Sequence, residues 1–396
     1  MGFRPFTHND SLISHAEMFA CTSHAPDTQA SVSELSNLIL CERAAMPLRK
    51  ASHESGRRHE RVKSELRMLA RSLEPGSALP PRSELVHQLR VARATLTRAV
   101  QQLETEGILT IRPRVGLYTT ERARLLTVAF AQYWEPYNLN SFDLALVEAL
   151  TRYGPDYGLF VEVHMLGTYE QSDKDRLAAF HRLVASRRYA GILSMTSRSI
   201  IGWRADLEKL GLPLAFNPII IDPSSLEELG VSLLCRRGCG RIAMLNHIES
   251  PNAAGERRYR QALQNHSLPY QPEWYVLIPD ELPWELAGYR HFRSAWEKWT
   301  RKPDGVVSSN DHVTQGMLRA AQDMGINIPG ELQIATHANR GLSQFTHPDI
   351  VRLEVDVQRM AQMMLEKMRD KIKGDRDETS AILKLIPAEE TKRFES

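Results

Sequence analysis

The stretch Leu79–Tyr118, which reads LPPRSELVHQLRVARATLTRAVQQLETEGILTIRPRVGLY, decides the fold of the first part of this chain. Pro80 and Pro81 open a short helix, because proline is tolerated in a first helical turn. A second helix is predicted over Ala92–Glu106, and Gly107 ends it. Its buried stripe has helical spacing and consists of Leu96, Ala99, Val100 and Leu103.

A further helix precedes this stretch, and a hairpin closes it. Val62, Leu66 and Leu69 recur at helical spacing, and the strand pattern appears at Ile108–Arg112 and Leu117–Thr120. Three helices followed by a β-hairpin predict a winged helix-turn-helix. In that fold the second helix of the pair enters the major groove, and its first residues reach the base edges.

The basic charge of the chain is concentrated in the same region. Residues Arg57–Arg124 contain 14 Lys and Arg against 7 Asp and Glu, whereas the whole chain of 396 residues has a formal charge of only +2. A compact basic segment favours nucleic-acid binding. The alternative is an ordinary solvated helical surface.

Arginine, threonine and glutamine dominate the exposed face of the Ala92–Glu106 helix. Arginine can pair bidentately with guanine, and the other two reach phosphate or base edges. Arg112 and Arg114 belong to the hairpin, where a wing would lie along the DNA backbone or minor groove. The face opposite the apolar stripe shows Arg93, Ala94, Thr97, Arg98 and Gln101.

This region resembles the DNA-binding domain of GntR-type bacterial regulators. The shared features are a Leu-Pro opening, a recognition helix of the form V-S-R-x-T-V-x-R-A-L, the sequence L-x-x-E-G and a wing with glycine. The resemblance places Arg93, Thr95 and Arg98 on DNA-contacting positions and Gly116 on the wing glycine. Ala92 replaces the usual serine, which removes a side-chain N-cap.

Two further departures from the family pattern bear on which operator sequence is recognised more than on the fold. Arg114 stands where a wing glycine is expected, and Ser83 stands where the family often has arginine, with Arg82 beside it. We expect DNA contacts from Arg82, Arg93, Thr95, Thr97, Arg98, Arg112, Arg114 and Gly116.

After a short linker at Thr119–Arg124, strand and helix patterns alternate to the end of the chain. Regular alternation predicts α/β architecture with parallel sheets, and the length suggests two lobes. The predicted strands are Leu125–Ala131, Leu159–His164, Gly191–Met195, Pro213–Phe216, Arg241–Leu245, Trp274–Ile278, Gly305–Ser308 and Leu332–Ala335. The predicted helices cover residues 140–153, 172–187, 198–210, 224–237, 252–265, 284–300, 312–324 and 356–372.

The second half of the chain resembles the effector region of LacI/GalR-type regulators. The matching stretches are KPDGVVSSNDHVTQGMLRAAQDMGINIPGEL from Lys302, CRRGCGRIAML from Cys235 and LIPAEET from Leu385. The resemblance implies a type I periplasmic-binding-protein fold, with two Rossmann-like lobes, three chain crossovers and a small ligand in the cleft. The expected organisation is a poorly ordered extension (1–56), a winged helix-turn-helix (57–120) and a two-lobed sensing and dimerisation domain (125–396).

Ligands of parallel α/β sheets bind at the carboxyl ends of the strands, which selects particular loops. These loops contain aromatic, amide and acidic side chains, the mixture that a sugar requires for its C–H faces and hydroxyl groups. The selected residues are Tyr133, Trp134, Tyr137, Asn138, Thr196, Arg198, Asn217, Asn310, Asp311, His337 and Asn339.

The LacI/GalR resemblance assigns roles to some of them. It places Asp311 on an aspartate that takes ligand hydroxyls, and Tyr133 and Trp134 on an aromatic loop that lines the cleft. A cleft arginine expected near position 255 is Gly255, with Arg257 and Arg258 close by, and the family's G-F-D-N reads THAN from Thr336. The expected ligand set is Tyr133, Trp134, Asn217, Arg257, Asp311 and His337.

Each assignment has a structural alternative. Tyr133 and Trp134 also suit a core or a dimer surface. Asp311 could simply cap the helix predicted to begin at His312. His337 alone is more typical of a satisfied buried histidine than of a ligand-binding residue.

Catalytic, metal and membrane functions find little support. G-x-S-x-G, H-E-x-x-H and Walker A patterns are absent, and Cys235 and Cys239 lack the second cysteine pair of a zinc site. We expect no cofactor. The longest apolar stretch, Leu212–Ile221, is interrupted by Asn217 and Pro218, and the N-terminus lacks a secretory pattern, so we expect a cytoplasmic protein.

The sequence therefore predicts a homodimeric, ligand-responsive transcriptional regulator that binds a double-stranded DNA operator and a sugar-like effector. A repressor of carbohydrate-utilisation genes fits this combination best. Two alternatives stay open: an α/β sugar-processing enzyme with an accessory basic domain, and a DNA-binding protein whose body only mediates dimerisation.

Overall fold

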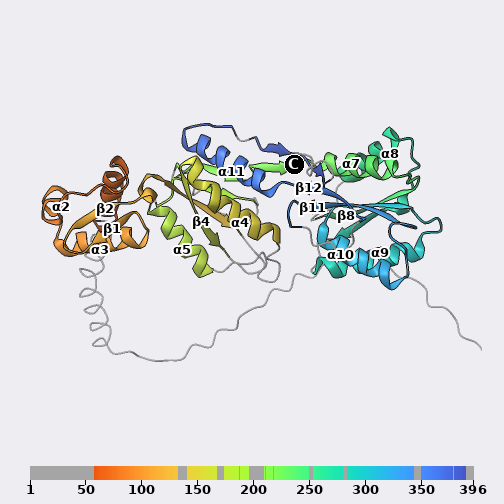
Figure 1. Cartoon of the computed structure of the whole chain (residues 1–396), viewed down its shortest axis with the longest axis horizontal. Coiled ribbons are helices and arrows are strands. Elements are labelled where there is room, and N and C mark those ends of the chain that lie inside the picture. Colours follow the sequence, from red (N-terminus) through yellow and green to blue (C-terminus); the bar gives the residue numbers. More distant parts are fainter. Residues whose placement is uncertain are drawn as a thin grey trace, which may run out of the picture.

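The computed structural model describes most of the chain after residue 57. Figure 1 shows a small orange head, a yellow-green first lobe and a green-to-blue second lobe following one another along the long axis. The described residues are 58–132, 141–166, 174–186, 188–195, 209, 211–216, 218–248, 253–279, 283–342, 349–377 and 379–388. The expectation for residues 1–56 lies outside them.

The head contains three helices and a two-stranded hairpin, as predicted. A helix over residues 58–72 is followed by α2 (Arg82–Leu89) and α3 (Arg93–Thr105). The antiparallel strands β1 (Leu109–Arg112) and β2 (Gly116–Thr119) form the wing. The winged helix-turn-helix fold is confirmed.

Leucine side chains from all parts of the head form its core. Leu66, Leu85, Leu96, Leu103 and Leu117 are at most 2% exposed and belong to one cluster. They hold the two helices of the helix-turn-helix at a fixed angle. The helix α3 therefore presents one constant face to solvent.

The first lobe is a four-stranded parallel sheet with helices on both faces. The strands lie in the order β4 (Leu159–Met165), β3 (Leu126–Gln132), β5 (Gly191–Ser194) and β6 (Leu214–Phe216). Alternate residues of β3 face opposite layers. Val128 and Phe130 pack in one core and Ala129 and Ala131 in another.

Three helices cover that sheet. The helix α4 (Ser141–Tyr153) packs against α11 (Val357–Ile372), and α11 contributes Met364 to the core on their face of the sheet. The helix α5 (Lys174–Ala185) supplies Phe180 to the core on the opposite face. Because α11 comes from the far end of the sequence, the first lobe is complete only when the chain returns to it.

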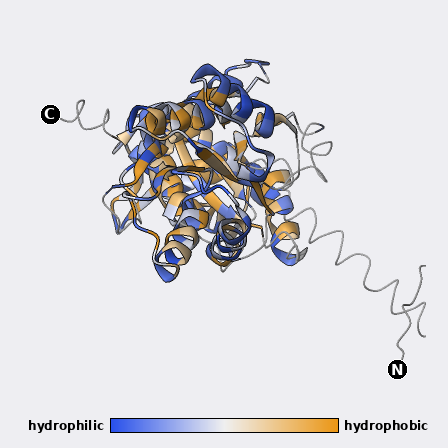
Figure 2. Cartoon of the chain, turned by 90° about the vertical axis from the view of Figure 1, so that its right-hand side faces the viewer, coloured by the Kyte–Doolittle hydropathy of each residue, from blue (hydrophilic) through white to orange (hydrophobic). Residues whose placement is uncertain are grey.

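The second lobe is a six-stranded sheet. Its order is β14 (Ile386–Pro387), β12 (Val351–Val355), β11 (Gln333–Asn339), β10 (Gly305–Ser308), β8 (Ile242–Ile248) and β9 (Tyr275–Pro279). All neighbours are parallel except β12 and β14. Figure 2 shows apolar strands inside and polar helix surfaces outside.

The helices α7 (Pro223–Arg236) and α8 (Ala253–Asn265) pack side by side, and their buried residues share a core with the sheet. The pair α9 (Trp284–Lys298) and α10 (Asp311–Asp323) contributes to a second, separate core.

The chain crosses between the lobes three times. It leaves the first lobe through β7 (Ile219–Ile221), returns after β12 to form α11, and crosses back through β13 (Ala381–Leu383) to β14. The strands β7 and β13 pair in parallel. This bilobal α/β fold, with its three crossovers, agrees with the predicted fold class.

The sequence prediction omitted three strands and shifted several ends. The strands β7, β12 and β13 were not predicted, and two of them have only three residues, too few for a period-2 pattern. The strand β14 lies in the stretch from Leu385 that resembles the closing strand of the LacI/GalR family. Strand β8 extends to Ile248 rather than Leu245, because its last residues pair with β9. The predicted helix 198–210 lies outside the described residues, apart from residue 209.

Two glycines bring α9 and α10 unusually close together. A Cβ atom at Gly288 would lie 2.1 Å from the carbonyl oxygen of Val313, and one at Gly316 would lie 1.8 Å from that of Glu285. The contact is near the first turns of both helices. It therefore sets the distance between Trp284 and Asp311, which begin them.

We predict that Gly316→Ala lowers the free energy of unfolding by about 1–3 kcal/mol or more, because backbone must move to admit the methyl group. Chemical denaturation of the full chain measures the change. Gly240→Ala is the matched control, since a Cβ there meets nothing within 4 Å, and it should change stability by less than about 0.5 kcal/mol. Equal effects of the two substitutions would contradict the close α9–α10 contact.

Candidate functional site

The outer face of α3 presents unpaired cationic side chains. Arg93 and Arg98 are exposed, whereas Thr95 and Thr97 beside them are half-buried. Neither arginine forms an ion pair with a described residue, although acidic side chains occur elsewhere in the head. Both guanidinium groups are therefore available to an external anion or base edge.

The N-terminus of α3 supports the same use. Ala92 is its N-cap residue and provides no side-chain hydrogen bond, as the sequence predicted. The first backbone N–H groups of the helix are thus left for another acceptor. A phosphate oxygen suits such a position. Arg82 begins the neighbouring helix α2 and is also exposed.

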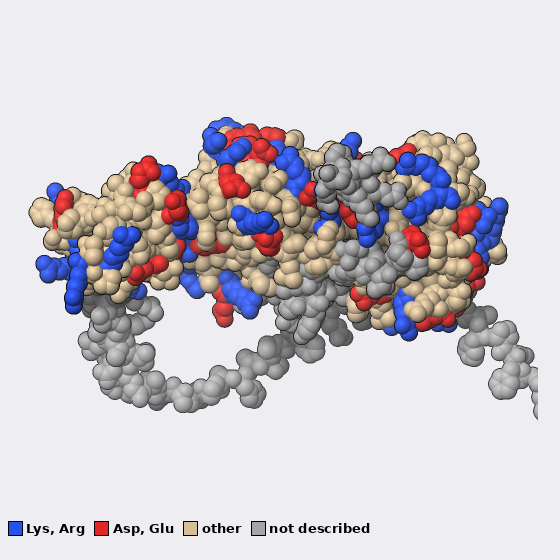
Figure 3. Space-filling model, viewed as in Figure 1, with Lys and Arg blue, Asp and Glu red and all other residues tan. Residues whose placement is uncertain are grey.

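The wing carries two arginines in different settings. The guanidinium carbon of Arg112 lies 4.1 Å from the centre of the Tyr118 ring, which holds that side chain along the hairpin. Arg114 has a φ of 64°, the left-handed conformation that a glycine would adopt without strain. Gly116 has a φ of 149°. Figure 3 shows Lys and Arg side chains at the end of the head that lies away from the lobes.

A second group of polar residues lies at the carboxyl ends of the strands in the second lobe. Asp311 Oδ2 accepts a hydrogen bond from Asn339 Nδ2 at 3.1 Å, and its Oδ1 accepts one from the backbone of His312. The cap of α10 is Asn310, whose Oδ1 accepts from Val313 N–H at 3.0 Å. Asp311 is therefore not the cap of this helix.

One acceptor in this group is left over. Asn339 is 5% exposed, and its Oδ1 atom is buried without a hydrogen-bond partner. His337, on the same strand, is half-buried. Burial lowers the pKa of His337, and the negative charge of Asp311 opposes this shift without reversing it, so the imidazole is neutral at pH 7.

One aromatic residue that the sequence prediction missed, Trp284, lies near the same strand ends. Trp284 packs between His247 and His312, with ring centres 5.3 and 5.8 Å away. The strand-end rule that selects the other loops also selects Trp284, because it begins the helix after β9.

Arg257 and Arg258 lie in different settings on α8, and the ligand role expected for Arg257 stays a prediction. Arg257 is exposed on α8, whereas Arg258 points inward and donates from Nε to Glu227 Oε1 at 3.1 Å. A Cβ atom at Gly255 would lie only 2.7 Å from the Tyr275 hydroxyl, which explains why no side chain occupies that position. Arg258, not Arg257, therefore brings a guanidinium near position 255.

Glu227 is 2% exposed, so its pairing with Arg258 matters for stability. Burial raises the pKa of Glu227, and the charge of Arg258 opposes that shift. Nearby, Asn246 donates to the Tyr275 hydroxyl at 2.7 Å. These four side chains form a polar cluster in which the charge of Arg258 balances that of Glu227.

The predicted residues Tyr133, Trp134 and Asn217 lie outside the described residues, as do Tyr137, Asn138, Thr196 and Arg198. Their assignments stay predictions.

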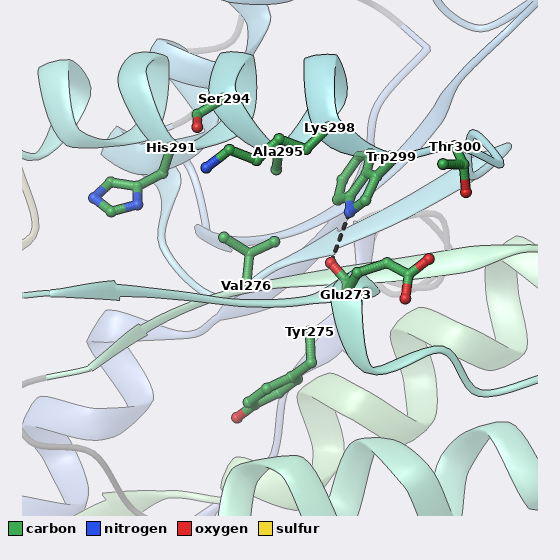
Figure 4. A pocket seen from close by; sticks show the side chains of 9 residues that line it. All are labelled: Glu273, Tyr275, Val276, His291, Ser294, Ala295, Lys298, Trp299 and Thr300. Carbon is green, nitrogen blue, oxygen red and sulfur yellow. Dashed lines mark hydrogen bonds between the residues drawn. The ribbon is translucent and has the colours of Figure 1, made fainter. Parts of the chain in front are cut away.

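A separate hollow lies at the opposite end of the second lobe. Figure 4 shows it between α9 and β9, with a volume of about 350 Å³. Its walls include Val276, Lys298 and Trp299, and the indole of Trp299 donates to the carbonyl of Glu273. It contains none of the predicted ligand residues, and it lies near the first residue of β9 rather than the carboxyl ends of the strands.

The described ranges contain neither a metal-binding cluster nor a membrane-spanning helix. There, no group of three or more histidine, cysteine or acidic side chains is placed to hold a metal ion. Within the same ranges, no helix has the length and apolar character needed to cross a bilayer.

Comparison with known families matches both parts of the chain. Residues 58–118 match the family of bacterial regulatory proteins called gntR, and residues 231–393 match the periplasmic binding protein-like domain. Residues 58–118 are thus similar to gntR-type regulators, and residues 231–393 are similar to the periplasmic binding protein-like domain. Both family resemblances predicted from the sequence are confirmed.

The relatives of the chain include regulators of transcription. It is 26% identical over 166 residues to the NTD biosynthesis operon regulator NtdR of Bacillus subtilis, covering 41% of this chain and 49% of that protein. It is 24% identical over 225 residues to the transcriptional repressor PurR of Vibrio vulnificus, covering 52% and 64%. The chain thus spans about half to just under two thirds of the length of these relatives.

Solved structures show the same architecture. A LacI-family regulatory protein from Chloroflexus aggregans matches with a TM-score of 0.54 at 18% identity, covering 66% of this chain and 96% of the other. A LacI-type regulator from a Rhodococcus species matches with a TM-score of 0.53 at 18% identity, covering 67% and 96%. At this level of identity the likeness establishes the fold.

We predict that Arg258→Ala destabilises the protein by about 1–3 kcal/mol, because it leaves the buried Glu227 carboxylate without its partner. Arg257→Ala is the control one residue away and should change the free energy of unfolding by less than about 0.5 kcal/mol. Denaturant titration of both variants measures the difference. A larger loss from Arg257→Ala would reverse the assignment of the two arginines.

Proposed function

We propose that this protein is a ligand-responsive transcriptional regulator, acting as a homodimer that represses genes for carbohydrate use. The observation that carries the proposal is the presence, in one chain, of a complete winged helix with unpaired outward arginines and a bilobal sensor fold. The similarity to NtdR and PurR, which are named as regulators of transcription, supports it.

The head supports DNA recognition through both charge and shape. Arg93 and Arg98 are five residues apart on α3, near the end of the helix that would enter the major groove. We propose Arg82, Arg112 and Arg114 as phosphate or minor-groove contacts around that helix. Thr95, Thr97 and Gly116 complete the contact surface.

The second lobe supports a hydroxyl-rich effector. The Asp311 carboxylate and the unpaired Oδ1 of Asn339 can accept hydrogen bonds from ligand hydroxyl groups, and the Trp284 ring suits the C–H face of a sugar. We propose that Tyr133, Trp134 and Asn217 complete this site from the first lobe, and His337 from the second. A bound hydroxyl group would satisfy the Asn339 oxygen, which otherwise costs free energy.

A homodimer follows from the mode of DNA reading. One winged helix contacts a single half-site, and two related by twofold symmetry read a pseudo-palindrome. Effector control then requires that the ligand bind one arrangement of the dimer more tightly than the other. A bacterial DNA-binding regulator works where the chromosome lies, so we assign the protein to the cytoplasm.

We predict that replacing Arg93 and Arg98 together by alanine weakens binding to the preferred operator by about 30-fold or more, since each base contact contributes roughly 1–3 kcal/mol. The operator is selected from random duplexes with the natural chain, and fluorescence anisotropy at fixed salt measures the affinity. A control with Arg290 and Arg293 on α9 replaced by alanine removes the same charge from the second lobe. Unchanged operator binding by the α3 variant would refute the proposed contact surface.

We predict that Asp311→Asn lowers the affinity for the effector by about 10-fold or more, since a hydrogen bond to a charged group contributes roughly 1.5–3 kcal/mol. A thermal-shift screen of monosaccharides and sugar acids identifies the effector, and calorimetry measures its affinity. Operator binding without effector should be unchanged, and Glu297→Gln, an exposed acid on α9, is the control. A normal effector response in Asp311→Asn would remove Asp311 from the site.

A further inference from the structure

The C-terminal end of the reading helix makes a contact with the first lobe that neither resemblance predicted. Glu106 is the C-cap residue of α3, at the opposite end of the helix from Arg93. Its side chain is 11% exposed and accepts hydrogen bonds from Arg67 of the first helix and from Arg188 Nη1, the latter at 2.9 Å. Arg188 belongs to the first lobe, just before β5.

Arg188 binds two carboxylates that come from different parts of the protein. Its Nε and Nη2 atoms donate to the two oxygens of Glu162 on β4, at 2.9 and 2.6 Å, while Nη1 reaches Glu106. A guanidinium group offers donors in several fixed directions, so one arginine can hold both partners. The result is a chain of alternating charges, Arg67–Glu106–Arg188–Glu162, which we call the charge joint.

The lobe side of the charge joint is fixed by further contacts. The Tyr189 hydroxyl donates to Glu162 Oε2 at 3.0 Å and lies 2.8 Å from His164 Nε2. Burial opposes ionisation of Glu162, but its interactions with His164 and Arg188 outweigh this effect and lower its pKa to about 2. The carboxylate therefore stays charged at any physiological pH, and the joint keeps its charge pattern.

A second contact fixes the segment between the head and the lobe. Arg122 in the short helix η1 (Glu121–Arg124) lies 3.5 Å over the Phe160 ring of β4 and donates to Thr127 Oγ1 at 2.9 Å. Arg71 of the first helix reaches the carbonyl groups of Ala123 and Leu125. The segment is thus held from both sides and does not act as a free tether.

We propose that the charge joint sets the orientation of α3 relative to the first lobe and transmits movement of that lobe to the DNA-reading surface. Glu106 and Arg188 are positioning residues in this scheme. The strand β5 begins two residues after Tyr189, so movement of the first-lobe sheet also moves Arg188. The part of this proposal that concerns transmission to the DNA-reading surface rests on the proposed function.

The decisive variant is Arg188→Gln in the full chain, because it breaks the joint from the lobe side and leaves the Arg67–Glu106 pair of the head intact. Calorimetry should show the transition of the head separating from that of the lobes and moving down by about 5–15 °C. Without effector, the affinity of the variant for the operator should stay close to that of the natural chain. The effector-induced change in operator affinity, typically 5–150-fold in coupled systems, should fall to near one.

Glu106→Gln tests the same joint from the head side, and Glu121→Gln is the control, because Glu121 is an exposed acid in the same segment. Glu106→Gln should abolish the effector response as Arg188→Gln does, with a larger loss of head stability because it also breaks the Arg67–Glu106 pair, and Glu121→Gln should match the natural chain. Non-additive effects in the double variant would support direct coupling of the two residues.

The outcomes separate the two proposals. If the natural chain binds no operator, the proposed function fails, while the calorimetric part of the test still judges the joint. If the natural chain binds operator and responds to effector, and Arg188→Gln melts and responds like it, the charge joint is refuted. A head that melts separately in the natural chain would also refute it.

Discussion

Parallel pairing of strands is the constraint on which the rest of this structure depends. A parallel neighbour cannot be joined by a tight turn, so each connection must run back along a face of the sheet as a helix. The carboxyl ends of β8, β10 and β11 consequently meet at one edge. Asp311, Asn339 and Trp284 are brought together there although they are far apart in the sequence.

The same constraint divides each lobe between distant parts of the chain. The first lobe needs α11, whose Met364 and Met368 complete its core, and the second needs β14. Neither lobe is therefore a continuous segment, and the crossover strands β7 and β13 bind the two together. A change in the angle between the lobes must pass through these few crossovers, which suits a fold that closes on a ligand.

The head is built on a different principle. Its contacts are local, its core is a small group of leucines, and its outer face is left unpaired for DNA. The contact with the lobe is mainly polar, through the charge joint and the stacking of Arg122 on Phe160. A polar joint of buried charges is specific in geometry, because any misplacement leaves a charge without its partner.

Local sequence patterns determined most of the elements. The leucine spacing of the head predicted its helices and hairpin, and alternation predicted the α/β lobes, because both depend on residues that are neighbours in the chain. Short strands such as β13 were missed, since three residues show no period. The sequence also selected Asp311 and His337, because a residue that follows a predicted strand must lie at the end of a sheet.

The sequence by itself determined the two fold types, their order, and the exposed basic face of α3, all of which follow from local periodicity and charge. Only the tertiary structure decided which arginine of α8 turns inward, that Asn310 rather than Asp311 caps α10, and that Trp284 joins the polar cluster. It alone revealed the charge joint between Glu106 and Arg188. The physical reason is that these contacts join residues on separate elements, and their distances depend on how helices pack over sheets rather than on any local pattern.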